Sequence, residues 1–193
     1  MNMTIDSASD ALHASLQLTA ALYRSPTAAL RDDLASGQVA ALSDSLALAL
    51  NLPAPALLIP DWLTVETSFV ALFVTNQHGI IPPYVGYALD NELLGPSFEA
   101  LTALYQSHGF TLDGTFNDLP DHLSAVAEAA LLLLEAERVD GALLLARQFL
   151  QPWFKRYADR VLSADGSGLY GPLTHFLKLA FTRFTEVQDE VAA

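Results

Sequence analysis

The chain contains no cysteine among its 193 residues. It therefore has no disulfide framework, no thiolate chemistry and no cysteine-ligated metal site. Basic residues are scarce, because nine Lys and Arg stand against 22 Asp and Glu for a formal net charge of −13. This acidity disfavours binding to nucleic acid or to an anionic membrane and favours a cationic partner. The same acidity would also serve simply to keep an apolar protein soluble.

Long uninterrupted hydrophobic runs are absent as well. Pro, Asp or Glu interrupts every apolar stretch before it reaches the about 18 residues of a membrane span, so we expect no stable membrane insertion. Residues 1–6 lack the basic patch and apolar segment of a secretory signal. We therefore expect a cytoplasmic protein.

The familiar catalytic and phosphate-binding motifs are missing. There is no Gly-rich phosphate loop, no His-Glu-x-x-His and no Gly-x-Ser-x-Gly, and none of the five scattered histidines has another at i+3 or i+4. Asp121 and His122 are adjacent and could form an acid–base pair. Adjacent helical residues point about 100° apart, however, so such a pair would need a third group that the sequence does not identify. We predict no catalytic residue, no metal and no cofactor.

What the sequence does contain is one helical pattern after another. The segment 120–137 consists almost entirely of Ala, Leu and Glu, the strongest helix formers. Its apolar residues cover more than half of the helix circumference, so neighbouring helices should pack around it. Asp121, Glu128 and Glu135 recur every seven residues and predict an acidic stripe along one face, with Asp121 and His122 in the first helical turn.

Helical spacing and proline or glycine punctuation predict further helices along the chain. Alternating strand patterns are absent, apart from Leu57–Ile59, which is too short to make a sheet. We predict an all-α, single-domain compact bundle of about nine to eleven helices over residues 1–193, frayed at 1–8 and 188–193. The first expected helix ends before Pro26, and the second runs from a Ser25 cap to Gly37. Further helices are expected over 39–50, 62–73, 84–91, 96–109 and 140–150. Pro152 should break or kink the last of these, the helix should resume over 153–161, and a final helix should start at Pro172.

Several short motifs follow one another in a fixed order: Leu72-Phe73, Gly79, Pro82-Pro83-Tyr84 with Tyr87, Leu94-Gly95, Leu104-Tyr105, Gly109 and Pro120-Asp121-His122-Leu123. This series resembles the TorD/DmsD/NarJ family of molybdoenzyme-maturation chaperones over roughly residues 10–185. Two positions depart from the family's pattern, because Ser68 stands where an acidic residue is usual and Val85-Gly86 replaces Glu-Ser. These departures leave the branch of the family, and hence the client, open.

The resemblance implies a TorD-like cytoplasmic chaperone without enzymatic activity. Such a protein would bind the twin-arginine leader, the apo form, or both, of a molybdopterin-containing oxidoreductase precursor, and would hold it for cofactor insertion before Tat export or assembly. A NarJ-like factor that grips the mature body of a reductase subunit is an alternative. An enzyme or nucleotide binder that uses an Asp121-His122 cleft is a third. The chain would be a monomer or a domain-swapped dimer.

The residues suit a leader, which combines two arginines with an apolar segment. We expect the leader-binding site to comprise an apolar groove and a carboxylate, Asp121, that meets guanidinium beside His122, with Glu128 and Glu135 continuing the acidic stripe. Leu72 and Phe73 are explained equally well as ordinary core. The residues expected to line the groove are Leu72, Phe73, Pro82, Pro83, Tyr84 and Tyr87.

Overall fold

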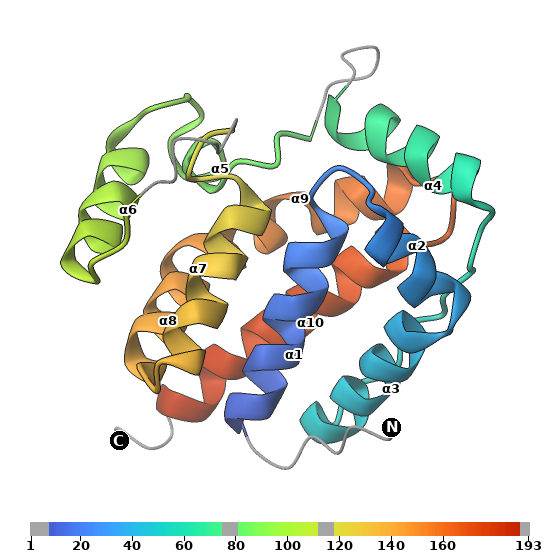
Figure 1. The fold of residues 1–193 in the computed structure, drawn as a ribbon, viewed down its shortest axis with the longest axis horizontal. Helices are drawn as coiled ribbons and strands as arrows, with labels where there is room; N and C mark the ends of the chain where they lie inside the picture. Colours follow the sequence, from blue (N-terminus) through green and yellow to red (C-terminus); the bar gives the residue numbers. More distant parts are fainter. Residues whose placement is uncertain (1–7, 75–80, 112–117, 190–193) are drawn as a thin grey trace.

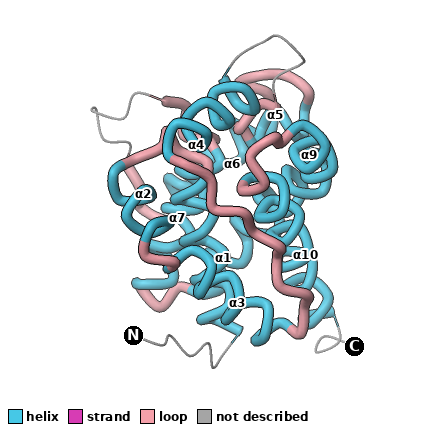
Figure 2. Tube along the Cα trace, turned by 90° about the vertical axis from the view of Figure 1, so that its right-hand side faces the viewer, coloured by secondary structure: helices cyan, strands magenta, loops and turns pink. Residues whose placement is uncertain are grey.

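The computed structural model describes residues 8–74, 81–111 and 118–189, with side chains up to 184. Within these ranges the chain is helical with no strand, which confirms the all-α prediction (Figures 1 and 2). The helices that it contains are α1 (Ala8–Leu22), α2 (Ala28–Ala35), α3 (Gln38–Leu50), α4 (Trp62–Phe69), η1 (Val70–Val74), α5 (Val85–Asp90), α6 (Pro96–Ser107), α7 (Leu123–Glu135), α8 (Val139–Leu145), η2 (Ala146–Leu150), α9 (Gln151–Ala164) and α10 (Tyr170–Asp189). Predictions for Gly79 in the loop before Pro82, for residues 112–117 in the turn before α7 and for the Val187 side chain lie outside the described residues.

The centre of the molecule is built by α1, α7, α9 and α10. Helix α1 packs against α7, α3 and α10, while α10 runs along α9 (Figure 1). The apolar face of α7 is buried, as its composition predicts, and it packs between α1 and α8. Helices α4 and α5 lie at one end of this bundle in both views (Figures 1 and 2). None of the described helices is both long and apolar enough to span a bilayer.

The structure corrects several predicted helix boundaries. Helix α2 begins at Ala28 instead of at Pro26, because the Thr27 hydroxyl accepts a hydrogen bond from the Leu30 amide and caps the first turn. At the chain ends, the described helices include Ala8 and residues 188–189. Helix α10 begins at Tyr170, two residues before Pro172, which fits because first-turn amides have no helical partner.

Pro152 does not interrupt the helical path. Helix α8 runs into the π-helical turn η2 and then into α9, which contains Pro152 in its first turn. Proline removes an amide donor and crowds the preceding turn, and the wider π turn accommodates both effects. The segment is therefore continuous from Val139 to Ala164.

Candidate functional site

A cleft of about 880 Å³ lies where the end of α1, the α4–η1 segment, the proline loop and the start of α7 meet. It combines aromatic and aliphatic surface with two carboxylates and one guanidinium. Its lining residues are Arg24, Ser25, Thr27, Phe69, Phe73, Val74, Pro82, Pro83, Tyr84, Tyr87, Leu93, Asp118, His122, Ser124 and Glu128.

Backbone hydrogen bonds join the proline loop to the start of α7. The Leu123 amide donates to the Pro83 carbonyl at 2.7 Å, and Tyr84 and His122 form an isolated antiparallel bridge. The same loop is held from the other side, because the buried Trp153 indole N–H donates to the Pro82 carbonyl at 2.7 Å. Two motifs that are far apart in sequence therefore form one wall of the cleft.

His122 is the N-cap of α7 and not a residue of its first turn. Its backbone is extended (φ −61°, ψ 137°), and its Nδ1 accepts from the Ser124 amide at 3.3 Å. The ring packs edge-on against Tyr84, with centroids 5.5 Å apart, and its Nε2 lies 3.9 Å from a carboxylate oxygen of Asp118. Burial lowers the pKa of His122, against the opposing effect of Asp118, so the imidazole is neutral at neutral pH.

Tyr84 carries a second link to Asp118. Its hydroxyl donates to Asp118 Oδ1 at 3.0 Å across 34 residues of sequence. Partial burial, together with this hydrogen bond and the neighbouring charge, raises the pKa of Tyr84 to about 12, so the phenol stays a donor. Asp118 is itself exposed at the cleft, with 44% of its side chain accessible.

Asp121 lies behind the cleft wall. It is fully buried, and its Oδ2 accepts from the Gly86 amide at 3.2 Å, whereas Oδ1 has no hydrogen-bond partner among the described residues. Burial raises the pKa of the Asp121 carboxyl. Because it faces Gly86 and does not line the cleft, Asp121 does not reach a guanidinium there, and it makes no acid–base pair with His122.

A side chain at position 86 would require the Asp121 carboxylate to shift. A Cβ on this residue would lie 2.8 Å from Asp121 Oδ2 and 3.5 Å from the Phe98 backbone nitrogen. The Gly86 amide donates to Asp121 Oδ2, and this hydrogen bond ties the start of α5 to the residue that precedes His122, the N-cap of α7.

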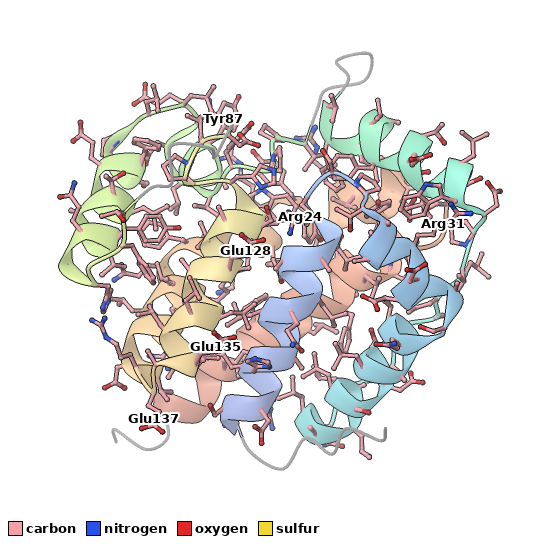
Figure 3. The ribbon with its side chains drawn as sticks, in the orientation of Figure 1. Arg24, Arg31, Tyr87, Glu128, Glu135 and Glu137 are labelled. Atoms are coloured by element: carbon pink, nitrogen blue, oxygen red, sulfur yellow. The ribbon has the colours of Figure 1, made fainter. Side chains whose placement is uncertain are left out.

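The acidic stripe predicted along α7 divides in the structure. Glu128 lines the cleft and forms an ion pair with Arg24 at 3.2 Å (Figure 3). Glu135 is exposed two turns further along the helix and does not line the cleft, and Asp121 precedes the helix altogether. Asp118, which the sequence pattern did not single out, supplies the second carboxylate of the cleft.

The apolar part of the site is also rearranged. Phe73 and Phe69, one helical turn before it, are buried at 4% and 5% exposure and touch the cleft only at its floor, and Leu72, equally buried at 4%, is absent from the lining. Val74 and Leu93 form an exposed apolar lip, at 57% and 52% accessibility. Of the expected site residues, the structure brings together Phe73, Pro82, Pro83, Tyr84, Tyr87, His122 and Glu128.

Sequence reasoning missed eight lining residues: Arg24, Ser25, Thr27, Phe69, Val74, Leu93, Asp118 and Ser124. Only Phe69 carried a usable signal, since it lies four residues before Phe73 on one helical face. Within the described ranges, no group of three or more His, Asp or Glu side chains is arranged to hold a metal ion.

Comparisons with known proteins agree with this architecture. Residues 32–163, more than half of the chain, match the family described as nitrate reductase delta subunit. A solved structure from Archaeoglobus fulgidus, assigned as a candidate redox enzyme maturation protein, is similar with a TM-score of 0.55 and 21% identity over 86% of this chain and 91% of that chain. No curated protein matches. The fold is thus shared with that structure, and the chain belongs to the nitrate reductase delta subunit family, the NarJ/TorD-type chaperones of redox enzyme maturation.

Proposed function

We propose that this protein acts in the cytoplasm on the precursor of a molybdopterin-containing oxidoreductase subunit. It binds the twin-arginine leader of that precursor, and the apo subunit with it, and holds the client for cofactor insertion before Tat export or assembly. The observation that carries the proposal is the presence of Asp118 and Glu128 in the same cleft as the aromatic and proline surface.

The chemistry of the cleft suits a leader. The carboxylates of Asp118 and Glu128 are acceptors for guanidinium, and the exposed Val74 and Leu93 offer contacts for an apolar segment. Pro82 is half-buried beside the buried Pro83 and presents surface whose backbone is already restricted, so binding orders little additional chain. The hydrogen bonds from Trp153 and Leu123 hold that pair in place.

Rough magnitudes indicate how the apolar surface and the carboxylates of the cleft each contribute to the binding free energy. Burying roughly 400 Å² of apolar leader surface at about 25 cal/mol/Å² yields about 10 kcal/mol. Association and ordering cost about 4–15 kcal/mol, so apolar contact alone leaves little net affinity. The carboxylates then decide whether binding is measurable, and binding should weaken as salt screens the partly exposed pairs.

The test is a binding titration with a fluorescent peptide that carries two adjacent arginines followed by an apolar segment. Asp118→Asn and Glu128→Gln remove charge and keep shape, and each should weaken binding by about two- to tenfold, with a larger effect at low salt. Glu135→Gln is the matched control, because it removes the same charge from α7 outside the cleft. Equal affinity in the wild type and both cleft variants would refute the proposed site.

A second candidate function is favoured by the family description itself. A match to the nitrate reductase delta subunit family supports an assembly factor that grips the mature body of a reductase subunit. The client would first be identified by co-purification from the native host. If the protein captured the client without its leader as strongly as the client with its leader, this second function would be favoured. Capture that requires the leader would favour the first.

A further inference from the structure

The cleft holds an arginine of the protein's own. Arg24 follows α1, lines the cleft, and places Nη1 3.2 Å from Glu128 Oε1 (Figure 3). This contact joins residues 104 apart in sequence, so the fold and not local geometry creates it. It puts a guanidinium on one of the two cleft carboxylates that our proposed function assigns to the client's arginines.

Charge balance makes this contact consequential. Among the described lining residues, Arg24 is the only Arg or Lys, against the carboxylates of Asp118 and Glu128. The whole chain has only nine Lys and Arg, and one of them neutralises half of the acidic charge in the cleft. A client guanidinium that approaches Glu128 therefore meets a carboxylate that already pairs with a guanidinium through one oxygen.

We propose that Arg24 is a built-in competitor for the client's arginine. In the empty cleft it pairs with Glu128, an arriving arginine displaces it, and its return to Glu128 promotes release of the client. This inference rests on the proposed function, because it names the regulation of the same site.

The geometry is suited to a displaceable contact. The Arg24 and Glu128 side chains are 54% and 45% accessible, so solvent screens the pair on both sides. Exposed ion pairs of this kind shift an equilibrium by about two- to fivefold. A client arginine that is partly dehydrated by the neighbouring aromatic surface competes from a stronger position. Arg24 thus lowers affinity modestly without blocking the cleft.

The experiment compares Arg24→Gln with the wild type, using the peptide with two adjacent arginines and an apolar segment. We expect Arg24→Gln to bind about two- to fivefold tighter, mainly through slower dissociation. Arg24→Lys keeps the charge and should stay closer to the wild type. Arg31→Gln is the matched control for overall charge, because Arg31 packs over the Trp62 ring and does not line the cleft.

A double-mutant cycle identifies the route of the effect. In a Glu128→Gln background the Arg24→Gln substitution should tighten binding no more than Arg31→Gln does, because the acceptor for which the two arginines compete has lost its charge. Unchanged or weaker binding by Arg24→Gln, with a thermal unfolding profile like the wild type, would overturn the inference. A gain equal to that of Arg31→Gln would overturn it too.

A second measurement separates this inference from the function on which it rests. Arginine amide is titrated into the wild type and Arg24→Gln, and the Glu128 side-chain carbon is followed by NMR. The inference requires a half-saturating concentration that is lower for Arg24→Gln, whereas equal values would refute it. If the peptide bound neither protein, the leader-binding function would fail, and the arginine amide titration would still decide the role of Arg24.

Discussion

Asp121 offers the sharpest test of the wall behind the cleft, because two substitutions separate its charge from its hydrogen bond. Asp121→Asn keeps an oxygen to accept from the Gly86 amide and removes the charge, whereas Asp121→Ala removes both. The two variants therefore differ in whether the buried Gly86 N–H keeps an acceptor. The wild type and Asp121→Asn differ in whether the buried side chain can ionise.

The first comparison has a definite magnitude. A buried donor without a partner costs about 1–3 kcal/mol. The free energy of unfolding of Asp121→Ala should therefore be lower than that of Asp121→Asn by this amount, and its urea midpoint should be lower. Circular dichroism at 222 nm across a urea series at pH 7 measures it. Because Gly86 lies in the first turn of α5, between Tyr84 and Tyr87, Asp121→Ala should also weaken peptide binding, while Asp121→Asn should preserve it.

The second comparison depends on pH. Burial raises the folded pKa of Asp121 above the unfolded value of about 3.9, so the stability it contributes is complete below that value and is lost as pH rises through the folded pKa. Asp121→Asn does not titrate. Its stability relative to the wild type should therefore increase from pH 4 to pH 7.

Two results would refute this reasoning. If Asp121→Asn were as unstable as Asp121→Ala at pH 7, the charge and not the acceptor would be the feature that the fold needs. If the wild type gained stability over Asp121→Asn as pH rose, the carboxylate would have a favourable partner and its pKa would not be raised.

Two further predictions concern the same wall. Trp153→Phe loses the donor to the Pro82 carbonyl, so it should lower the free energy of unfolding in urea by about 1–3 kcal/mol and weaken peptide binding. Wild-type values in both assays would contradict a role for this hydrogen bond in holding the proline loop. Because burial lowers the folded pKa of His122, stability should fall as pH drops below about 6.5, and His122→Asn, which keeps an N-cap acceptor, should flatten that slope between pH 7 and 5. A slope that His122→Asn leaves unchanged would assign the acid sensitivity to another group.

The sequence was sufficient for the helices and for much of the cleft surface. Helical spacing correctly placed the buried face of α7. Proline positions correctly marked the connector after α3 and the loop before α5. These features are encoded within a few residues of each other, through periodicity, capping and the fixed φ of proline. The ordered motifs from Leu72-Phe73 to Pro120-Asp121-His122 also predicted the family, which the match over residues 32–163 confirms.

Tertiary structure alone decided which carboxylates face the cleft. A helix that began at Pro120 would have placed Asp121 on a stripe with Glu128, but the extended backbone at His122 turns the Asp121 carboxylate inward to the Gly86 amide and leaves Asp118 at the surface. Arg24 reaches Glu128 only because α1 packs along α7. Periodicity within one segment determines which face of a helix is buried, whereas the side chains that meet across a cleft depend on how distant segments pack, and no local pattern encodes that.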